Sequence, residues 1–165
     1  MKNITQAIDV AEFILDWHQK KSVDETVCLL PSYFQALLYY CQGYHLALNN
    51  TPLFNDTIIL KDNEPFIETV GEIYYPLLKV PYQEIPKSEN RGNINALNQE
   101  QNEFVDEVLN VIGQFSMWKI KEMSLKETPI MTAQANIANI ANEPTNNAIT
   151  QQSMKEYFIN YVVKY

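Results

Sequence analysis

The sequence predicts a mainly α-helical single domain, with about five to seven helices around one central buried helix and one short β-hairpin. Apolar residues recur at helical spacing along most of the chain, and the longest such stripe lies within residues 33–48. Two apolar runs rich in β-branched residues flank a turn-type sequence at residues 62–65, which is typical of a hairpin. The 165 residues contain no internal repeat and 46% of them are hydrophobic, so we expect one domain over residues 1–165.

The central helix is predicted over residues 33–48, YFQALLYYCQGYHLAL. Pro31 suits its first turn, where a missing N–H costs nothing, and Asn49-Asn50 followed by Pro52 should end it. The apolar side chains repeat at the 3.6-residue period, and we interpret their stripe as core packing. The stripe consists of Phe34, Leu37, Leu38, Cys41, His45 and Leu48.

Two further helices are predicted before the middle of the chain. The first covers residues 5–20, with Thr5 as its N-cap. The other covers residues 68–79, and Pro76 should kink or end it.

The second half of the chain carries clear helix-start signals. Asn98, followed by Gln101 three residues later, is a capping-box pattern for a helix that Gly113 ends. Ser116 is predicted to cap a short helix, and Thr150 is predicted to cap the last one.

Three non-helical segments are expected between these helices. The runs at residues 57–61 and 66–67 should form the hairpin strands. Residues 80–97 contain several Pro, Gly and Asn residues and are predicted to be a linker loop. Residues 131–149 are rich in Asn and Ala with little charge, and we interpret them as a second loop.

Composition limits the classes of partner. The formal net charge is −8 and the pI is about 4.7, which disfavours nucleic acid and suits either solubility or a basic protein partner. The N-terminal sequence lacks the apolar run of a signal peptide, and no run of about 18 apolar residues would span a membrane. The spacing of Cys28 and Cys41 implies no disulfide framework, so we expect a cytoplasmic protein.

Catalytic motifs are not found. The chain has four glycines and no phosphate-binding loop, no G-x-S-x-G and no Cys-x-x-Cys. Cys41 and His45 have the i, i+4 spacing of half a metal site, but they share the apolar face and are expected to be a buried thiol and a core histidine. We therefore expect no enzyme, no metal and no cofactor. Trp17 and Trp118 lie in helical apolar patterns and are expected to be core.

The central helix also carries a family resemblance. YFQALLYYCQGYHLAL, followed by Pro52-Leu53-Phe54, resembles the "KLQKLLYYAQGWHLAL…PLF" signature of the Panacea domain, whose family includes SocA-like antitoxins and GepA-type proteins of prophages and mobile elements. Residues 98–116 look like the family's "EEEFLDEVLEKYGHLS", and residues 149–161 resemble its "ISNEDIKEYF". The matching residues of the signature are Gln35, Leu37, Leu38, Tyr39, Tyr40, Gln42, Gly43, His45, Leu46, Ala47 and Leu48.

Two departures mark a divergent member. Where the family usually has Tyr-Gly-Pro-Val, this chain has Asn63-Glu64-Pro65-Phe66, and glutamate resists a positive φ that glycine allows. Where the family usually has Pro-Trp, the chain has Pro-Ile at residues 129–130. Whether the partner matches those of typical members therefore stays open.

The resemblance implies an antitoxin-like protein that binds and neutralises a cognate toxin protein by direct contact. Some family members act instead as adaptors that deliver a toxin to a protease, so a protease is a second implied partner. The alternative is a phage or mobile-element accessory protein that binds a host protein.

We expect the partner surface at the tip of the hairpin. Loop tips on a rigid scaffold often carry specificity, and Asp62, Asn63 and Glu64 add two carboxylates there. Tyr40 and Tyr44 on the neighbouring central helix could add flat, rigid contact area. These five residues are the predicted partner-binding site, with a half-buried core role as the alternative for the two tyrosines.

Overall fold

The computed structural model describes residues 5–21, 29–78, 84–85, 91–139 and 147–161. The described residues form seven α-helices, two short 3₁₀ helices and three strands, so the predicted mainly helical fold with a hairpin is confirmed. In chain order the elements are α1 (Ala7–Lys21), α2 (Pro31–Asn49), β1 (Ile58–Lys61), β2 (Glu64–Phe66), α3 (Glu68–Tyr74), η1 (Tyr75–Leu77), η2 (Ile94–Ala96), α4 (Gln99–Ile112), α5 (Met117–Leu125), α6 (Thr128–Asn139), β3 (Ala148–Ile149) and α7 (Gln151–Phe158).

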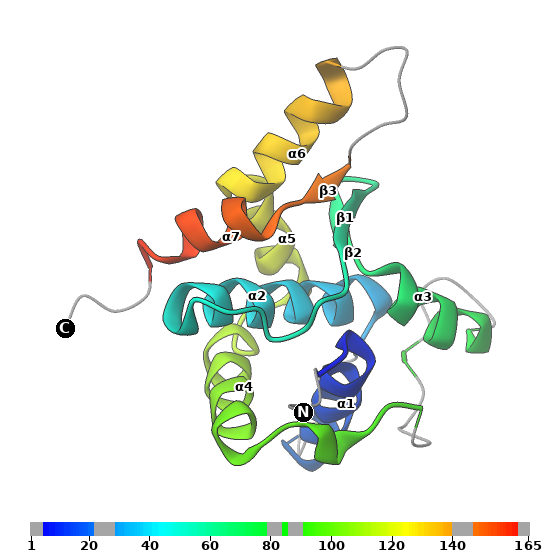
Figure 1. The fold of residues 1–165 in the computed structure, drawn as a ribbon. Coiled ribbons are helices and arrows are strands. Elements are labelled where there is room, and N and C mark those ends of the chain that lie inside the picture. Colours follow the sequence, from blue (N-terminus) through cyan, green and yellow to red (C-terminus); the bar gives the residue numbers. More distant parts are fainter. Residues whose placement is uncertain (1–4, 22–28, 79–83, 86–90, 140–146, 162–165) are drawn as a thin grey trace.

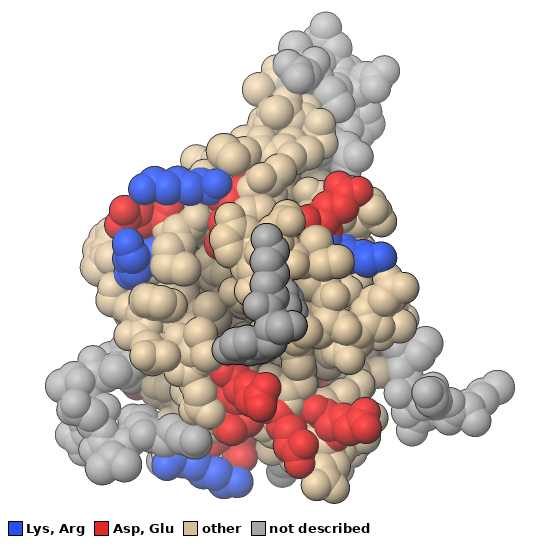
Figure 2. Space-filling view, turned by 90° about the vertical axis from the view of Figure 1, so that its left-hand side faces the viewer, with Lys and Arg blue, Asp and Glu red and all other residues tan. Residues whose placement is uncertain are grey.

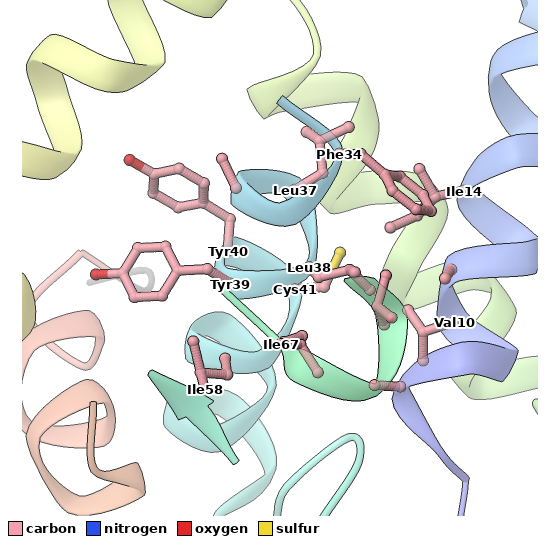
Figure 3. Close-up of a cluster of buried hydrophobic side chains, with 14 of the residues drawn as sticks. Val10, Ile14, Phe34, Leu37, Leu38, Tyr39, Tyr40, Cys41, Ile58 and Ile67 are labelled. Atoms are coloured by element: carbon pink, nitrogen blue, oxygen red, sulfur yellow. The ribbon is translucent and has the colours of Figure 1, made fainter. Parts of the chain in front are cut away.

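Helix α2 lies at the centre of the molecule, with α1 and α4 on one side and α5, α6 and α7 on the other (Figure 1). Phe34 and Leu38 on α2 are fully buried beside Val10 and Ile14 of α1 (Figure 3). The predicted stripe is therefore core, except at its end. Leu48 is 52% exposed because it lies in the last turn, where the described elements leave α2 uncovered.

Polar side chains of α2 fix the chain on both sides of the hairpin. Gln42 accepts hydrogen bonds from the backbone N–H groups of Leu53 and Phe54 and donates to the carbonyl of Phe54 at 2.7 Å. Gln35 makes the same kind of pair with Ile67, accepting from its N–H and donating to its carbonyl. These bonds satisfy buried backbone groups and attach the hairpin to α2.

The hairpin has a two-residue turn. Lys61 pairs with Glu64, while Asp62 and Asn63 have φ values of 52° and 63°. Two consecutive positive φ values define a type I′ turn, in which Asp and Asn are well tolerated. Glu64 lies in strand β2, so the residue that replaces the family's glycine needs no positive φ here.

The described sheet has the order β2-β1-β3. Strand β3 is absent from the predicted elements because it contains only two residues. So short a run shows neither the helical nor the strand periodicity of apolar residues.

Most helix ends agree with the predictions. Pro31 begins α2, and Asn50 ends it with a left-handed φ of 58°. Asn98 and Gln101 form the capping box of α4. The predicted Thr5 cap is wrong, because α1 begins at Ala7. The backbone N–H of Gln6 instead donates to the carboxylate of Asp9 in the first turn, at 3.0 Å.

The predicted loop over residues 131–149 needs correction, whereas the described residues within 80–97 contain only the short helix η2. Residues 131–149 are not one loop, because α6 continues to Asn139 and β3 forms at residues 148–149. Burial of Ile130 and Ala133 compensates for the weak local helix preference of this Asn-rich stretch. Within residues 80–97, the N–H of Ile85 donates to the carbonyl of Leu29 at 2.9 Å, and η2 packs against α1. Residues 79–83, 86–90 and 140–146 lie outside the described part of the chain.

Candidate protein-binding site

A groove of about 500 Å³ lies between the first turn of α2, the hairpin and α5. We call it the Trp118 groove, because the indole of Trp118 lines it and is 73% exposed. Ser32 and Tyr33 line it from α2, and Glu64 and Phe66 line it from the hairpin. Its size lies within the range typical of ligand sites, so it can accept a bulky side chain.

Hydrogen bonds of the lining residues hold the three walls together. The hydroxyl of Ser32 donates to Glu64 at 2.7 Å, which connects α2 to the hairpin. The hydroxyl of Tyr33 donates to the carbonyls of Gly113 and Phe115 at 3.4 and 3.2 Å, so it fixes the turn that leads into α5. These hydrogen bonds connect the first turn of α2 to the hairpin and to the turn before α5.

Most charges that line the groove are compensated within the protein. Glu64 forms an ion pair with Lys121 at 3.2 Å. The ammonium of Lys61 lies 4.6 Å from the centre of the Phe66 ring, a cation–π contact. Asp62 is exposed and has no ion-pair partner among the described residues, and the adjacent Lys61 keeps its positive charge, so the two acidic and two basic side chains that line the groove balance.

The exposure of Trp118 corrects the prediction that it belongs to the core. Helix α5 buries Ile120 and Ser124. Trp118 precedes Ile120 by two residues, which is about 200° around a helix, so it points away from the core. The charged neighbours Lys119 and Lys121 were the available sequence signal for this outward face.

The structure brings together only part of the predicted partner-binding site. Asp62 and Glu64 line the groove, and Asn63 lies at the turn, where it accepts a hydrogen bond from Gln134 at 3.3 Å. Tyr40 is 1% exposed, and Tyr40 and Tyr44 pack against Phe158 of α7 rather than toward the groove. Surface contact through Tyr40 is thus not available in this structure, and Tyr44 is half-buried.

Tyr40 instead belongs to a buried polar cluster that the sequence did not reveal. Tyr39 and Tyr40 project from the same side of α2 (Figure 3) and donate to the two carboxylate oxygens of Glu127, each at 2.9 Å. Glu127 is 5% exposed and directly precedes α6. Burial raises the pKa of Glu127 to about 7, and the two tyrosine hydrogen bonds oppose that rise.

Cys41 and His45 have internal roles. Burial raises the pKa of the Cys41 thiol to about 12, which keeps it protonated. His45 Nδ1 lies 2.6 Å from the carbonyl of Thr51, and burial lowers the pKa of its imidazole. Among the described residues, no group of three or more His, Cys, Asp or Glu side chains could hold a metal ion. Cys28 lies outside the described residues.

The described helices include none that is both long and apolar enough to cross a membrane.

Comparison with protein-family models gives a match over residues 34–129, which is more than half of the chain. The matching model is described as "Antitoxin SocA-like, Panacea domain". Comparisons with curated proteins and with solved structures give no match.

Proposed function

The chain belongs to the SocA-like antitoxin family with a Panacea domain, and from this membership we propose that it binds a toxin protein and neutralises it by direct contact. The family match is the observation that carries the proposal. The family match does not identify the residues that contact the partner. They have to be inferred from the surface of the structure.

Most signature residues of α2 are buried and serve the fold, whereas Leu48 in the last turn is exposed. Gln35 and Gln42 bond the backbone next to the hairpin. Tyr39 and Tyr40 bond Glu127, and the Phe158 ring lies against Gly43. The Trp118 groove supports binding at a different surface, because tryptophan is enriched at interface hot spots.

The charge of the chain supports a basic partner. Helix α4 carries Glu100, Glu103, Asp106 and Glu107 and no lysine or arginine. Figure 2 shows acidic side chains gathered on the lower part of one face, at the height of α4 in Figure 1. Such a field raises the association rate of a positively charged protein.

Co-expression with the protein encoded by each neighbouring gene tests the proposal, and a neighbour that arrests growth when it is expressed alone is the candidate toxin. We expect restored growth and co-purification of the two proteins in one complex. The same experiment in a protease-deficient host separates two mechanisms, because an adaptor loses its effect there while direct occlusion does not. Growth arrest that persists despite abundant folded chain would contradict the proposal.

A further inference from the structure

We propose that Glu127 controls the docking of α6 in response to pH. While its carboxyl group is protonated, α6 stays packed against the rest of the protein. When the group ionises, α6 detaches more often, and the other helices stay folded. This inference does not depend on the proposed function.

Helix α6 is held to the rest of the protein by few side chains. Ile130 and Ala133 are buried, but Met131 is 45% and Ile137 is 36% exposed. Residues 135–138 are all exposed, and α6 extends away from α2 (Figure 1). A helix of 12 residues is marginally stable in water without tertiary packing. The docking of α6 therefore depends on contacts at its first two turns.

Glu127 lies at the beginning of these turns. Its backbone carbonyl accepts from the N–H groups of Ile130 and Met131, at 3.1 and 3.0 Å. Its two carboxylate oxygens accept from the hydroxyls of Tyr39 and Tyr40, each at 2.9 Å. One residue therefore starts α6 and also connects it to α2.

The groups that face the Glu127 carboxylate are phenols. Tyr39, Tyr40 and Tyr44 come from α2, and Tyr157 comes from α7. Burial is the largest cause that raises the pKa of all four phenols, so they stay neutral where a carboxyl group titrates. Glu127 is therefore the member of this cluster whose charge changes near neutral pH.

No cation compensates an ionised Glu127 among the described residues. Glu127 forms none of their ion pairs, and α6 contains no charged residue. The adjacent Lys126 is exposed and pairs with Glu122 of α5 at 3.4 Å. An ionised carboxylate here is buried with two neutral donors and no opposite charge, which is unfavourable.

Detachment of α6 removes this cost because it exposes the carboxylate to water. Burial raises the pKa of Glu127 from 4.5 to about 7, and the bonds from Tyr40 and Tyr39 oppose the rise. The free energy of opening should therefore fall as pH rises from 4.5 to about 7 and stay constant above that range. Weakly packed elements open at a lower free energy than the whole protein.

Hydrogen exchange of the full chain, followed by mass spectrometry from about pH 4.5 to about pH 8, tests the inference. Each rate is divided into the rate of the unstructured peptide at the same pH to give a protection factor. Peptides from α6 are compared with peptides from α4, which buries Val105 and Leu109. Glu127→Gln cannot ionise, and its amide can bond both tyrosines. Glu156→Gln is the matched control, because Glu156 is exposed on α7.

In wild type, α6 should be at least about tenfold less protected than α4 at every pH, because it opens separately. Its protection should fall at least about tenfold between the two ends of the pH range. Glu127→Gln should abolish this fall, and Glu156→Gln should retain it. Tyr39→Phe removes a bond that favours the ionised form, so the fall should extend to higher pH.

Equal protection of α6 and α4 in wild type would overturn the inference, because α6 would then open only with the whole protein. The same fall in Glu127→Gln as in wild type would also overturn it, because another group would be responsible. If Glu127→Gln does not fold, Tyr39→Phe decides: a pH profile identical to that of wild type contradicts the role of Glu127.

Discussion

Glu127 is a buried acidic residue that connects α2 to the start of α6 through hydrogen bonds. Its carboxylate is buried, accepts from two tyrosine hydroxyls of α2 and directly precedes α6. Removing a carboxylate from water is unfavourable, and two hydrogen bonds compensate only part of that cost. The neutral form is therefore favoured by burial, and the stability of the protein is coupled to pH.

We expect the free energy of unfolding to fall as pH rises from about 4.5 to about 7. The pKa of Glu127 rises from 4.5 to about 7 on folding, so its stabilising contribution is complete below 4.5 and is lost as pH passes through the folded value. At about 1.4 kcal/mol per pH unit the loss is about 3 kcal/mol. Urea unfolding of wild type and Glu127→Gln across this range measures it. Parallel pH profiles for the two proteins would count against this role.

Leu38 is a residue whose contribution can be predicted from packing alone. It is fully buried in the middle of α2. Leu38→Ala should lower the free energy of unfolding by about 2–5 kcal/mol, because the lost transfer energy and the remaining cavity act together. Denaturant unfolding measures the change, and Leu48→Ala is the control because Leu48 is exposed on the same helix. A loss below about 0.5 kcal/mol for Leu38→Ala would be inconsistent with this packing.

At the scale of the elements, α2 and α7 approach closely because Gly43 of α2 has no side chain. The Phe158 ring of α7 lies where a Cβ on Gly43 would be. The ring is buried and packs against Tyr39, Tyr40 and Tyr44, so it cannot easily move away.

Gly43→Ala should therefore destabilise the protein by about 1–3 kcal/mol, although alanine is the better helix former. Thermal and urea unfolding measure the effect. Phe158→Leu in the same chain is the matched test, because a smaller side chain leaves space for the new methyl group. The double variant should lose less than the sum of the two single variants, and strict additivity would contradict the clash.

The elements also show where sequence patterns are informative. The capping box of α4 at Asn98 and the hairpin turn at Asp62 could be predicted, because both depend on local hydrogen bonds and backbone preference. Helix α6 could not, because its Asn-rich sequence becomes helical only when Ile130 and Ala133 are buried by other elements. The outward direction of Trp118 is indicated in the sequence only by its neighbours Lys119 and Lys121, because which face of a short helix is buried depends on the elements around it.

For the whole molecule, the core extends beyond the stretch that matches the family. The match ends at residue 129, yet Ile130, Ile149, Met154 and Phe158 are all buried in the core. Strand β3 also pairs with β1 and completes the described sheet. The matched stretch alone therefore lacks the part of the core that α6, β3 and α7 supply.

A fragment of residues 1–129 should fail to fold cooperatively, because the aromatic side of α2 would lose Phe158 and face water. Circular dichroism during heating should show no sharp transition for the fragment. The full chain is the control and should melt in one sharp transition. A cooperative melt of the fragment would show that the later elements are dispensable.

The two tryptophans differ in exposure to water, so their fluorescence can be told apart. Trp17 is half-buried and its indole N–H donates to Asp106 at 3.0 Å, whereas Trp118 is 73% exposed to water. Intrinsic fluorescence of the free chain therefore combines a shielded emitter with a water-exposed one. Iodide should quench the fluorescence of Trp118 more strongly than that of Trp17. A ligand bound in the groove should shift the emission of Trp118 to shorter wavelength and leave the emission of Trp17 unchanged.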